Sequence, residues 1–308
     1  MKHIFGSAET EKKLSCLREY LKAYSVALSK QHFARVYIDA FAGTGDRTET
    51  KAVLPSFFSS ADEALVEITT PGSARIAIET TPAFHSIVLI ENDPLKAAKL
   101  KSVVDEYPGR RVQVRHGDAN NIVQGICKRR DWHKERTRGV IFLDPYGMEV
   151  DWLTVEAIAN TKALDCWYFF PLSGLYRNAP KDALKLDAGK VTSLNRVFGT
   201  DLWRTEWYEE EPLRLDLLGD LFQKERRIAD VDRIEEWVHK RLLTVFKGTV
   251  LKPLRLNHTN GAPMASLFFA VSNDHPAAVR VASDIANHIL KAGSLCGVGS
   301  MKTPSFRN

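Results

Sequence analysis

Five short apolar segments, each running into glycine, proline or an acidic residue, constrain most strongly what this chain can fold into. They read ARVYIDAFAG (34–43), SIVLIEND (86–93), RVQVRHGDAN (111–120), GVIFLDPYG (139–147) and DCWYFFPLSG (165–174). The stretches between them have helical composition and read SARIAIET (73–80), PLKAAKLKSVVDEY (94–107), NNIVQGICKRR (120–130) and DWLTVEAIANT (151–161). Strands that alternate with helices predict a parallel sheet with helices on both faces.

The two ends of the chain extend this pattern. Apolar residues at three- and four-residue steps predict a helix over about 9–30. Near the other end, APMASLFFAVSND (262–274) predicts a strand and HPAAVRVASDIANHILKAG (275–293) a helix, so C-terminal residues are expected to complete the sheet. The intervening stretch is richer in charge and has helical periodicity. We therefore expect one α/β domain over 1–308 with a helical insertion over 177–247.

Composition limits the class of protein. Of the 308 residues, 44% are hydrophobic and 26% are charged, as in ordinary globular proteins. The sequence has no run of about 18 apolar residues and its N-terminus has no apolar signal segment, so we expect a cytosolic protein that does not enter a membrane. The four cysteines form no CxxC pair, which predicts reduced thiols and neither a disulfide framework nor a metal site. The net charge of +5 permits contact with nucleic acid without establishing it.

The segment YIDAFAGTGDR (37–47) predicts a ligand site where the first strand ends. In an open parallel sheet, ligands bind at the carboxyl ends of the strands, at the point where the strand order reverses. Gly43 and Gly45 allow the turn to come close to a ligand, because no Cβ stands in the way. Asp39 ends the strand and is placed to receive a cation or an amine. The same two glycines also suit a tight turn without a ligand.

Acidic residues end the following strands as well. Glu91 is placed to accept hydrogen bonds from the two hydroxyls of a ribose, although it also neighbours a helix-capping sequence. Asp118 suits either an adenine edge or the N-cap of the helix that follows it. Asp144 ends the fourth strand, where a reactive group is expected, and Pro145 restricts it to extended backbone. Each acidic residue therefore has a structural interpretation beside the functional one.

The glycine turn distinguishes two classes of cofactor. A dinucleotide-binding domain needs G-x-G-x-x-G leading directly into a helix, whose N-terminus meets a pyrophosphate. Here the segment AGTGDRTET (42–50) has no third glycine and no immediate apolar helix. A ligand with a positive sulfonium and no phosphate favours acidic residues near the turn, as Asp39 and Asp46 provide. S-adenosylmethionine therefore fits better than NAD.

Taken together, the motifs resemble those of the three-Cys-motif partner proteins (TcmP), a bacterial family. The matching segments are KKLSCLREYLKAY (12–24), YIDAFAGTG (37–45), PGSARIAIE (71–79), IVLIENDP (87–94), HGDANN (116–121), FLDPYG (142–147) and ASLFFAVSN (265–273). The resemblance implies a Rossmann-like, doubly wound, mostly parallel sheet of the class I methyltransferase type, with bound S-adenosylmethionine. The cofactor contacts that it implies are Asp39, Phe41, Gly43, Gly45, Glu91 and Asp118. The three cysteines of the family name belong to a partner protein, since this chain has no CxxxCxxC.

The segment Asp144-Pro145-Tyr146-Gly147 is similar to the D-P-P-Y tetrad of amino-methyltransferases. In that tetrad, a side-chain oxygen and a backbone carbonyl hold an exocyclic amine while an aromatic ring stacks on the base. This chain departs from the pattern, because Tyr146 replaces the second proline and Gly147 replaces the aromatic residue. Asp144, Pro145 and Tyr146 are the candidate catalytic residues. The predicted reaction is methyl transfer to an amine nitrogen of nucleic acid, and its rate is expected to come mainly from positioning. A base inside a duplex would have to be flipped out first.

Two other functions stay open on the sequence. The altered tetrad also suits a non-catalytic module that uses the cofactor fold to engage a three-Cys-motif protein in a phage-related or mobile-element system. An NAD-linked oxidoreductase is disfavoured by the missing third glycine.

Three further features each have a functional and a structural interpretation. The run KRRDWHKERTR (128–138) either follows a phosphate backbone or forms a solvated helix end, and we favour the second. The stretch 48–73 is expected to be a long loop, either a lid that closes Phe57 and Phe58 over a ligand or a segment packed on the core. His116 is expected to be a buried or capping residue rather than a metal ligand.

Overall fold

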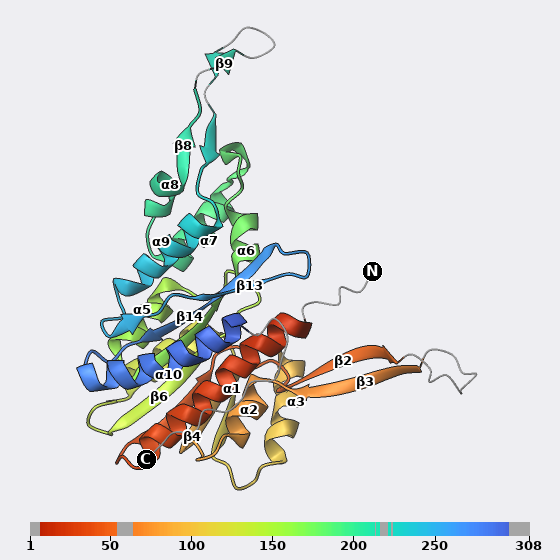
Figure 1. Ribbon diagram of the computed structural model, residues 1–308, viewed down its shortest axis with the longest axis vertical. Coiled ribbons are helices and arrows are strands. Elements are labelled where there is room, and N and C mark those ends of the chain that lie inside the picture. Colours follow the sequence, from red (N-terminus) through yellow and green to blue (C-terminus); the bar gives the residue numbers. More distant parts are fainter. Residues whose placement is uncertain (1–6, 54–63, 213, 216–220, 223, 296–308) are drawn as a thin grey trace.

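A mixed sheet forms the centre of the protein, whose computed structural model describes residues 7–53, 64–212, 214–215, 221–222 and 224–295 (Figure 1). Its strands are β1 (Ala34–Asp39), β4 (Ser86–Glu91), β5 (Val112–His116), β6 (Thr137–Leu143), β7 (Leu164–Phe170), β12 (Thr249–Val250), β13 (Leu254–Asn257) and β14 (Pro263–Val271). The strand order is β12-β14-β7-β6-β1-β4-β5, and β13 also pairs with β14. The five strands from β1 to β7 in this sheet are parallel, whereas β14 is antiparallel to β7.

The order of the strands reverses at β1. Chain order proceeds outward from β1 to β4 and β5 on one side, and to β6 and β7 on the other. In register, Asp39 lies opposite Leu89 of β4 and Phe142 of β6. The carboxyl ends of β1, β4 and β6 therefore meet at the switch point where open α/β sheets bind ligands. The predicted doubly wound, mostly parallel sheet is confirmed.

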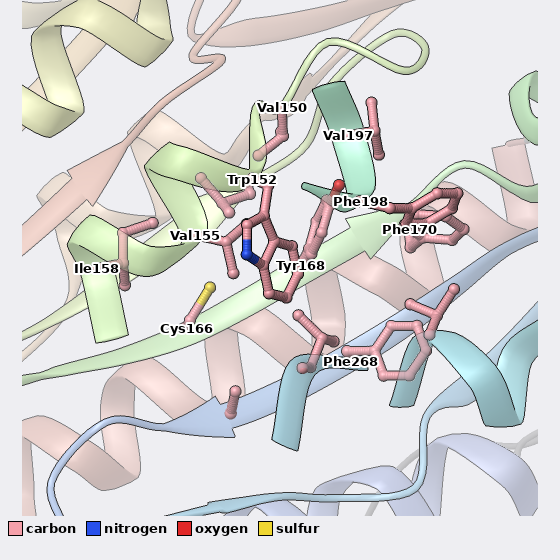
Figure 2. Close-up of a cluster of buried hydrophobic side chains, with 14 of the residues drawn as sticks. Val150, Trp152, Val155, Ile158, Cys166, Tyr168, Phe170, Val197, Phe198 and Phe268 are labelled. Atoms are coloured by element: carbon pink, nitrogen blue, oxygen red, sulfur yellow. The ribbon is translucent and has the colours of Figure 1, made fainter. Parts of the chain in front are cut away.

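Helices cover both faces of the sheet. They are α1 (Ser7–Ser29), α2 (Ser73–Glu79), α3 (Pro94–Asp105), α4 (Ala119–Arg129), α5 (Trp152–Asn160) and α10 (Pro276–Leu295). Along β1, Tyr37 packs with the buried side chains of α1, α2 and α10, whereas Val36 and Ile38 pack with those of α4 and α5. Figure 2 shows the second face, where Val155 of α5 lies beside Cys166 of β7. Successive strand residues point to opposite faces, so a strand buried on both faces reads as a continuous apolar run.

Helix α1 is anchored to the sheet by its own buried side chains. Cys16, Leu17, Tyr20 and Leu21 are at most 1% exposed. The Tyr20 hydroxyl donates a hydrogen bond of 2.7 Å to the carboxylate of Asp165, near the start of β7. The predicted amphipathic helix is thus confirmed, and Tyr20 fixes its register against the sheet. Among the described residues, no helix has the length and apolar character needed to span a bilayer.

The region between β7 and β12 contains helices and also short strands that the sequence did not indicate. The helical elements are α6 (Leu172–Asn178), the 3₁₀ turn η1 (Ala183–Lys185), α7 (Ala188–Phe198), α8 (Leu202–Trp207) and α9 (Val231–Leu243). Two antiparallel ladders pair β8 (Tyr208–Glu210) with β11 (Glu225–Arg227), and β9 (Arg214–Leu215) with β10 (Leu221–Phe222). These ladders extend away from the sheet (Figure 1).

Aromatic side chains join this region to the sheet. Phe198 of α7 lies 5.4 Å from Trp207 and 4.9 Å from Trp237 of α9 between ring centroids, with edge-to-face geometry in both pairs. The ring of Phe170, at the end of β7, lies 6.1 Å from that of Phe198. The helices of this region therefore share one buried cluster with β7 and α5, which Figure 2 shows around Phe198.

The predicted loop over 48–73 is instead largely a β-hairpin. Strands β2 (Asp46–Val53) and β3 (Ala64–Pro71) pair antiparallel from Asp46 opposite Pro71 to Val53 opposite Ala64. The reason lies in the composition, because TETKAV and ALVEITT are rich in threonine, valine and isoleucine, which favour strands. The hairpin extends away from the sheet in Figure 1. Phe57 and Phe58, the predicted lid residues, lie outside the described residues.

Candidate functional site

The glycine turn after β1 lies at the switch point, and glycine suits its two positions for different structural reasons. Gly43 and Gly45 both have positive φ, at +61° and +86°, where L side chains are strained. A Cβ on Gly45 would lie 3.0 Å from a terminal methyl group of Leu100 in α3, so packing also favours glycine there. A Cβ on Gly43 would meet nothing within 4 Å. The turn is therefore open on the Gly43 side, where a ligand can approach the backbone.

Glu91, the last residue of β4, binds this turn directly. Its Oε2 accepts a hydrogen bond of 2.9 Å from the backbone N–H of Gly43, and its Oε1 accepts one of 2.8 Å from that of Asp93. The side chain is half-buried. Each carboxylate oxygen can accept two hydrogen bonds, so each keeps capacity for another donor. Glu91 thus shapes the turn and can still accept hydroxyl donors.

Asp39 is a fully buried acid at the end of β1. Burial, together with the negative charge of Asp144, raises its pKa to about 6, while hydrogen bonds from Ser73, the Phe41 backbone and Tyr37 oppose this shift. The Phe41 N–H lies 3.2 Å from Asp39 Oδ1, and the Phe41 ring packs partly buried against the core. Phe41 therefore acts on Asp39 through its backbone. A buried carboxyl group beside a second one suits a site that receives a cation.

Asp144 follows β6 and is paired with a residue that sequence reasoning missed. Lys13 of α1 places its Nζ 2.6 Å from Asp144 Oδ2, and the two side chains are 8% and 22% exposed. The Lys13 ammonium also lies 4.3 Å from the centroid of the Phe169 ring on β7. One signal was present in the sequence, because Lys13 precedes Leu17 by four residues and Tyr20 by seven. This spacing places Lys13 on the buried stripe of α1.

The other residues of the tetrad have contrasting environments. Pro145 is buried, whereas Tyr146 is 87% exposed. The Lys96 ammonium, in the first turn of α3, lies 4.9 Å from the centroid of the Tyr146 ring. A Cβ on Gly147 would meet nothing within 4 Å. The loop after β6 therefore presents an exposed aromatic ring with a cation beside it, next to the strand-end carboxylates.

Asp118 has the structural role that the sequence offered as its alternative. Its carboxylate accepts a hydrogen bond of 2.9 Å from the backbone N–H of Asn121 and so caps α4. His116 Nε2 lies 3.0 Å from the carbonyl oxygen of Asn92, which joins the ends of β4 and β5. The side chain of Asp118 is exposed, and contact with adenine stays a prediction.

Replacing Asp118 by serine separates the two roles of this residue. Serine also caps helices, so we expect Asp118→Ser to change the free energy of unfolding by less than about 1 kcal/mol. If the carboxylate also holds an adenine amine, the affinity for an adenine-containing ligand should fall about fivefold or more. Chemical denaturation and calorimetry measure the two quantities on the same sample. Unchanged affinity would leave Asp118 with the capping role alone.

The charge of Asp46, the second acidic residue of the turn, is already offset by an ion pair. Arg75 of α2 donates from Nε to Asp46 Oδ1 at 2.6 Å and from Nη2 to Oδ2 at 2.7 Å. The same guanidinium bonds Glu106 and the hydroxyl of Tyr107. Bidentate pairing of this kind fixes geometry and offsets charge. Among the two acids of the turn, Asp39 is therefore the one that suits a cationic ligand.

The basic run 128–138 fits its structural interpretation. Trp132 is 3% exposed, and its Nε1 donates a hydrogen bond of 3.1 Å to the carbonyl oxygen of Cys127. Because the ring is buried, it cannot stack on bases as an aromatic residue of a nucleic-acid groove would. Cys16, Cys127 and Cys166 are buried, as predicted, and Cys296 lies outside the described residues.

Comparisons with known proteins give distant structural matches. No family model and no curated protein matches the chain. A Legionella pneumophila protein of solved structure is 16% identical over 79% of this chain and 94% of that one, with a TM-score of 0.40. An S-adenosylmethionine-dependent methyltransferase from Clostridium acetobutylicum is 10% identical over 83% and 92%, with a TM-score of 0.37. An rRNA methylase from Streptococcus thermophilus is 10% identical over 70% and 95%, with a TM-score of 0.27. At these scores, the strand order and register of the chain itself carry the fold assignment.

Proposed function

We propose that the protein binds S-adenosylmethionine at the switch point and transfers its methyl group to an amine nitrogen of nucleic acid. The observation that carries this proposal is the open turn at Gly43, bordered by the carboxylates of Glu91 and Asp39. Bound there, S-adenosylmethionine would supply a methyl group on a positively charged sulfur. The three residues come from β1, the turn after it and β4, so one ligand can contact Gly43 and Glu91 while the buried carboxylate of Asp39 acts on it through its charge.

The residues at the switch point fit this cofactor in charge and in hydrogen bonding. Glu91 would accept hydrogen bonds from the ribose hydroxyls with the acceptor capacity that Gly43 and Asp93 leave free. Asp39 would face the positive end of the cofactor, since a buried acid gains most from a cation. Gly43 would let the ligand approach the turn. A pyrophosphate, in contrast, would meet two acids here, which disfavours NAD.

The loop after β6 suits an amine acceptor that carries a flat ring. Asp144 has a carboxylate oxygen, Oδ1, beside the one that Lys13 holds, and this oxygen would orient the amine. The exposed ring of Tyr146 would stack on a base, a contact that is worth about 1 to 3 kcal/mol in single-stranded nucleic-acid sites. Lys96 beside that ring would contact a phosphate. Rate would come mainly from holding the nitrogen in line with the methyl group.

A second candidate function is a non-catalytic module that engages a three-Cys-motif protein, as the family resemblance implies. The observation that favours it is the ion pair of Asp144 with Lys13, which occupies one oxygen of the predicted amine-holding carboxylate. Such a module would bind the cofactor without turnover on any nucleic acid.

Tyr146→Ala tests the proposed acceptor class. Because the ring is 87% exposed and lies beside Lys96 at the surface, its loss should leave the fold and the affinity for S-adenosylmethionine unchanged. Transfer of labelled methyl groups to single-stranded DNA or RNA should fall about 5- to 150-fold at subsaturating nucleic acid. Cofactor binding without transfer to any nucleic acid would favour the second candidate. Absence of cofactor binding would exclude methyl transfer and leave the fold as a scaffold for a protein partner.

The pKa of Asp39 predicts how cofactor affinity depends on pH. If the sulfonium pairs with the ionised form of Asp39, whose pKa is about 6, affinity should rise about tenfold from pH 5 to pH 7.5 and then level off. Asp39→Asn removes the titrating group, so its affinity should be lower at pH 7.5 and nearly constant over this range. Calorimetry at several pH values measures both curves. The neutral S-adenosylhomocysteine is the control, and an equal pH dependence for this ligand would contradict a charge interaction at Asp39.

A further inference from the structure

We propose that Lys13 determines the charge specificity of this site, so that the site admits one cationic group, the sulfonium, and only a neutral acceptor amine. The inference rests on the proposed function and names a property that the glycine turn and the tetrad do not contain. Lys13 and Asp144 form an ion pair although they are 131 positions apart in the chain. A lysine side chain that is 8% exposed beside a predicted amine-holding carboxylate requires an explanation.

Anchoring of α1 does not require Lys13. Leu17, Tyr20 and Leu21 are already buried against the sheet, and the hydrogen bond from Tyr20 to Asp165 fixes the helix two turns further along. Burying an ammonium and a carboxylate is costly, and an ion pair of this kind often contributes little to stability compared with apolar residues of the same size. The placement of Lys13 is therefore better explained by its effect on the site than by the docking of its helix.

Three charged groups form a connected set at the ends of β1 and β6. The Lys13 ammonium contacts Asp144 directly, and the charge of Asp144 acts on the buried carboxyl group of Asp39. Above about pH 6 the two acids carry two negative charges, of which Lys13 offsets one. The set then has a net charge of −1. One positive group of a ligand can balance this charge, and the sulfonium of S-adenosylmethionine is such a group.

The same set disfavours a second cation. An amine that is protonated in solution, such as a lysine side chain or a polyamine, would approach Asp144 as an alkylammonium beside the Lys13 ammonium, where like charges repel at short range. An exocyclic amine of a nucleobase is neutral and only donates hydrogen bonds, so it can use Asp144 Oδ1 while Lys13 stays on Oδ2. Lys13 would thereby exclude charged amines from a site that is otherwise acidic.

The ratio of the affinities for S-adenosylmethionine and S-adenosylhomocysteine measures the charge of the site, because the two ligands differ in the sulfonium. We expect Lys13→Met to raise this ratio about three- to tenfold at pH 7.5, and Asp144→Asn to lower it by a similar factor. Methionine keeps the length and apolar stem of lysine and leaves Asp144 partly exposed. The double variant, which removes one charge of each sign, should return the ratio close to that of the native protein. Tyr20→Phe, which alters another polar contact of α1, should leave the ratio unchanged.

Binding of n-butylammonium to the protein saturated with S-adenosylmethionine, whose sulfonium already balances the charge of the set, tests acceptor exclusion. The native protein should show no binding up to millimolar concentration, whereas Lys13→Met should bind this cation measurably. Equal ratios in all variants, or equal n-butylammonium binding by the native protein, would overturn the inference while the cofactor site stands. Failure of the native protein to bind either cofactor form would overturn the proposed function, and the inference with it.

Discussion

Replacing Glu91 by alanine should weaken the binding of S-adenosylmethionine about 10- to 100-fold. The carboxylate holds the backbone N–H groups of Gly43 and Asp93, and its remaining acceptor capacity is assigned to the ribose hydroxyls. Alanine leaves all of these donors without their partner, and an unpaired buried donor costs about 1 to 3 kcal/mol. The turn would also lose the contact that fixes its position relative to β4. S-adenosylhomocysteine has the same ribose, so its affinity should fall by the same factor.

Two further variants make the Glu91 result specific. Glu91→Gln keeps one oxygen acceptor and should show a smaller loss of affinity than alanine. Glu235→Ala also removes a carboxylate that accepts hydrogen bonds, from Arg255 and Ser266, but it lies on α9 away from the glycine turn. It should reduce stability without changing affinity. Calorimetry on folded samples compares the affinities of the three variants for S-adenosylmethionine. If Glu91→Ala bound the cofactor as tightly as the native protein, Glu91 would only shape the turn.

The sequence predicted those parts of the site that follow from strand topology. Apolar runs such as 86–91 and 139–143 identify parallel strands, because a strand buried on both faces has no polar alternation. Once the strands are parallel and adjacent, residues that end them must meet at one edge. Asp39, Glu91 and Asp144 come together for this reason, although 105 positions separate the first from the last.

Contacts between distant side chains were beyond the sequence. The pairing of Lys13 with Asp144 depends on how α1 lies across the sheet, and a lysine on an apolar stripe is ordinarily expected to extend into solvent. Trp132 lies in a basic run, yet it is buried because the turn after α4 folds the ring onto the core. In both cases tertiary packing decides which side chain is exposed, and the sequence offered only one signal, the place of Lys13 on the apolar stripe of α1.

The hairpin over 46–71 was wrongly predicted as a loop for a different reason. Periodicity identifies a strand best when one face is buried, and these segments mix threonine, glutamate and lysine with apolar residues. Their strand character lies in β-branched residues rather than in a pattern of burial. The same limit applies to β8 and β11, which are three residues each. Very short strands, and strands that extend away from the sheet, are therefore recognised only in the structure.

Asp165 should make the protein less stable as the pH rises, with a loss of about 2 to 3 kcal/mol in the free energy of unfolding between pH 5 and pH 8. Burial raises the pKa of this carboxyl group from 3.8 to about 7, while the hydrogen bond from Tyr20 and the charge of Arg138 oppose the shift. Between these two pH values the folded protein keeps a proton that the unfolded chain has released. Stability therefore falls as the pH rises through this window and is constant with respect to Asp165 above it.

Asp165→Asn removes this titration from both the folded and the unfolded state. The loss of unfolding free energy between pH 5 and pH 8, measured by chemical denaturation, should therefore be about 2 to 3 kcal/mol smaller in this variant than in the native protein. Any constant cost of the buried amide cancels in the difference between the two pH values. Tyr20→Phe should act in the opposite direction, because it removes the hydrogen bond that favours the ionised form and extends the loss above pH 7. Equal pH dependence of the native protein and Asp165→Asn would mean that Asp165 is ionised throughout. Asp165 would then be a fixed negative charge beneath α1, and the hydrogen bond that it accepts from Tyr20 would be charge-assisted at both pH values.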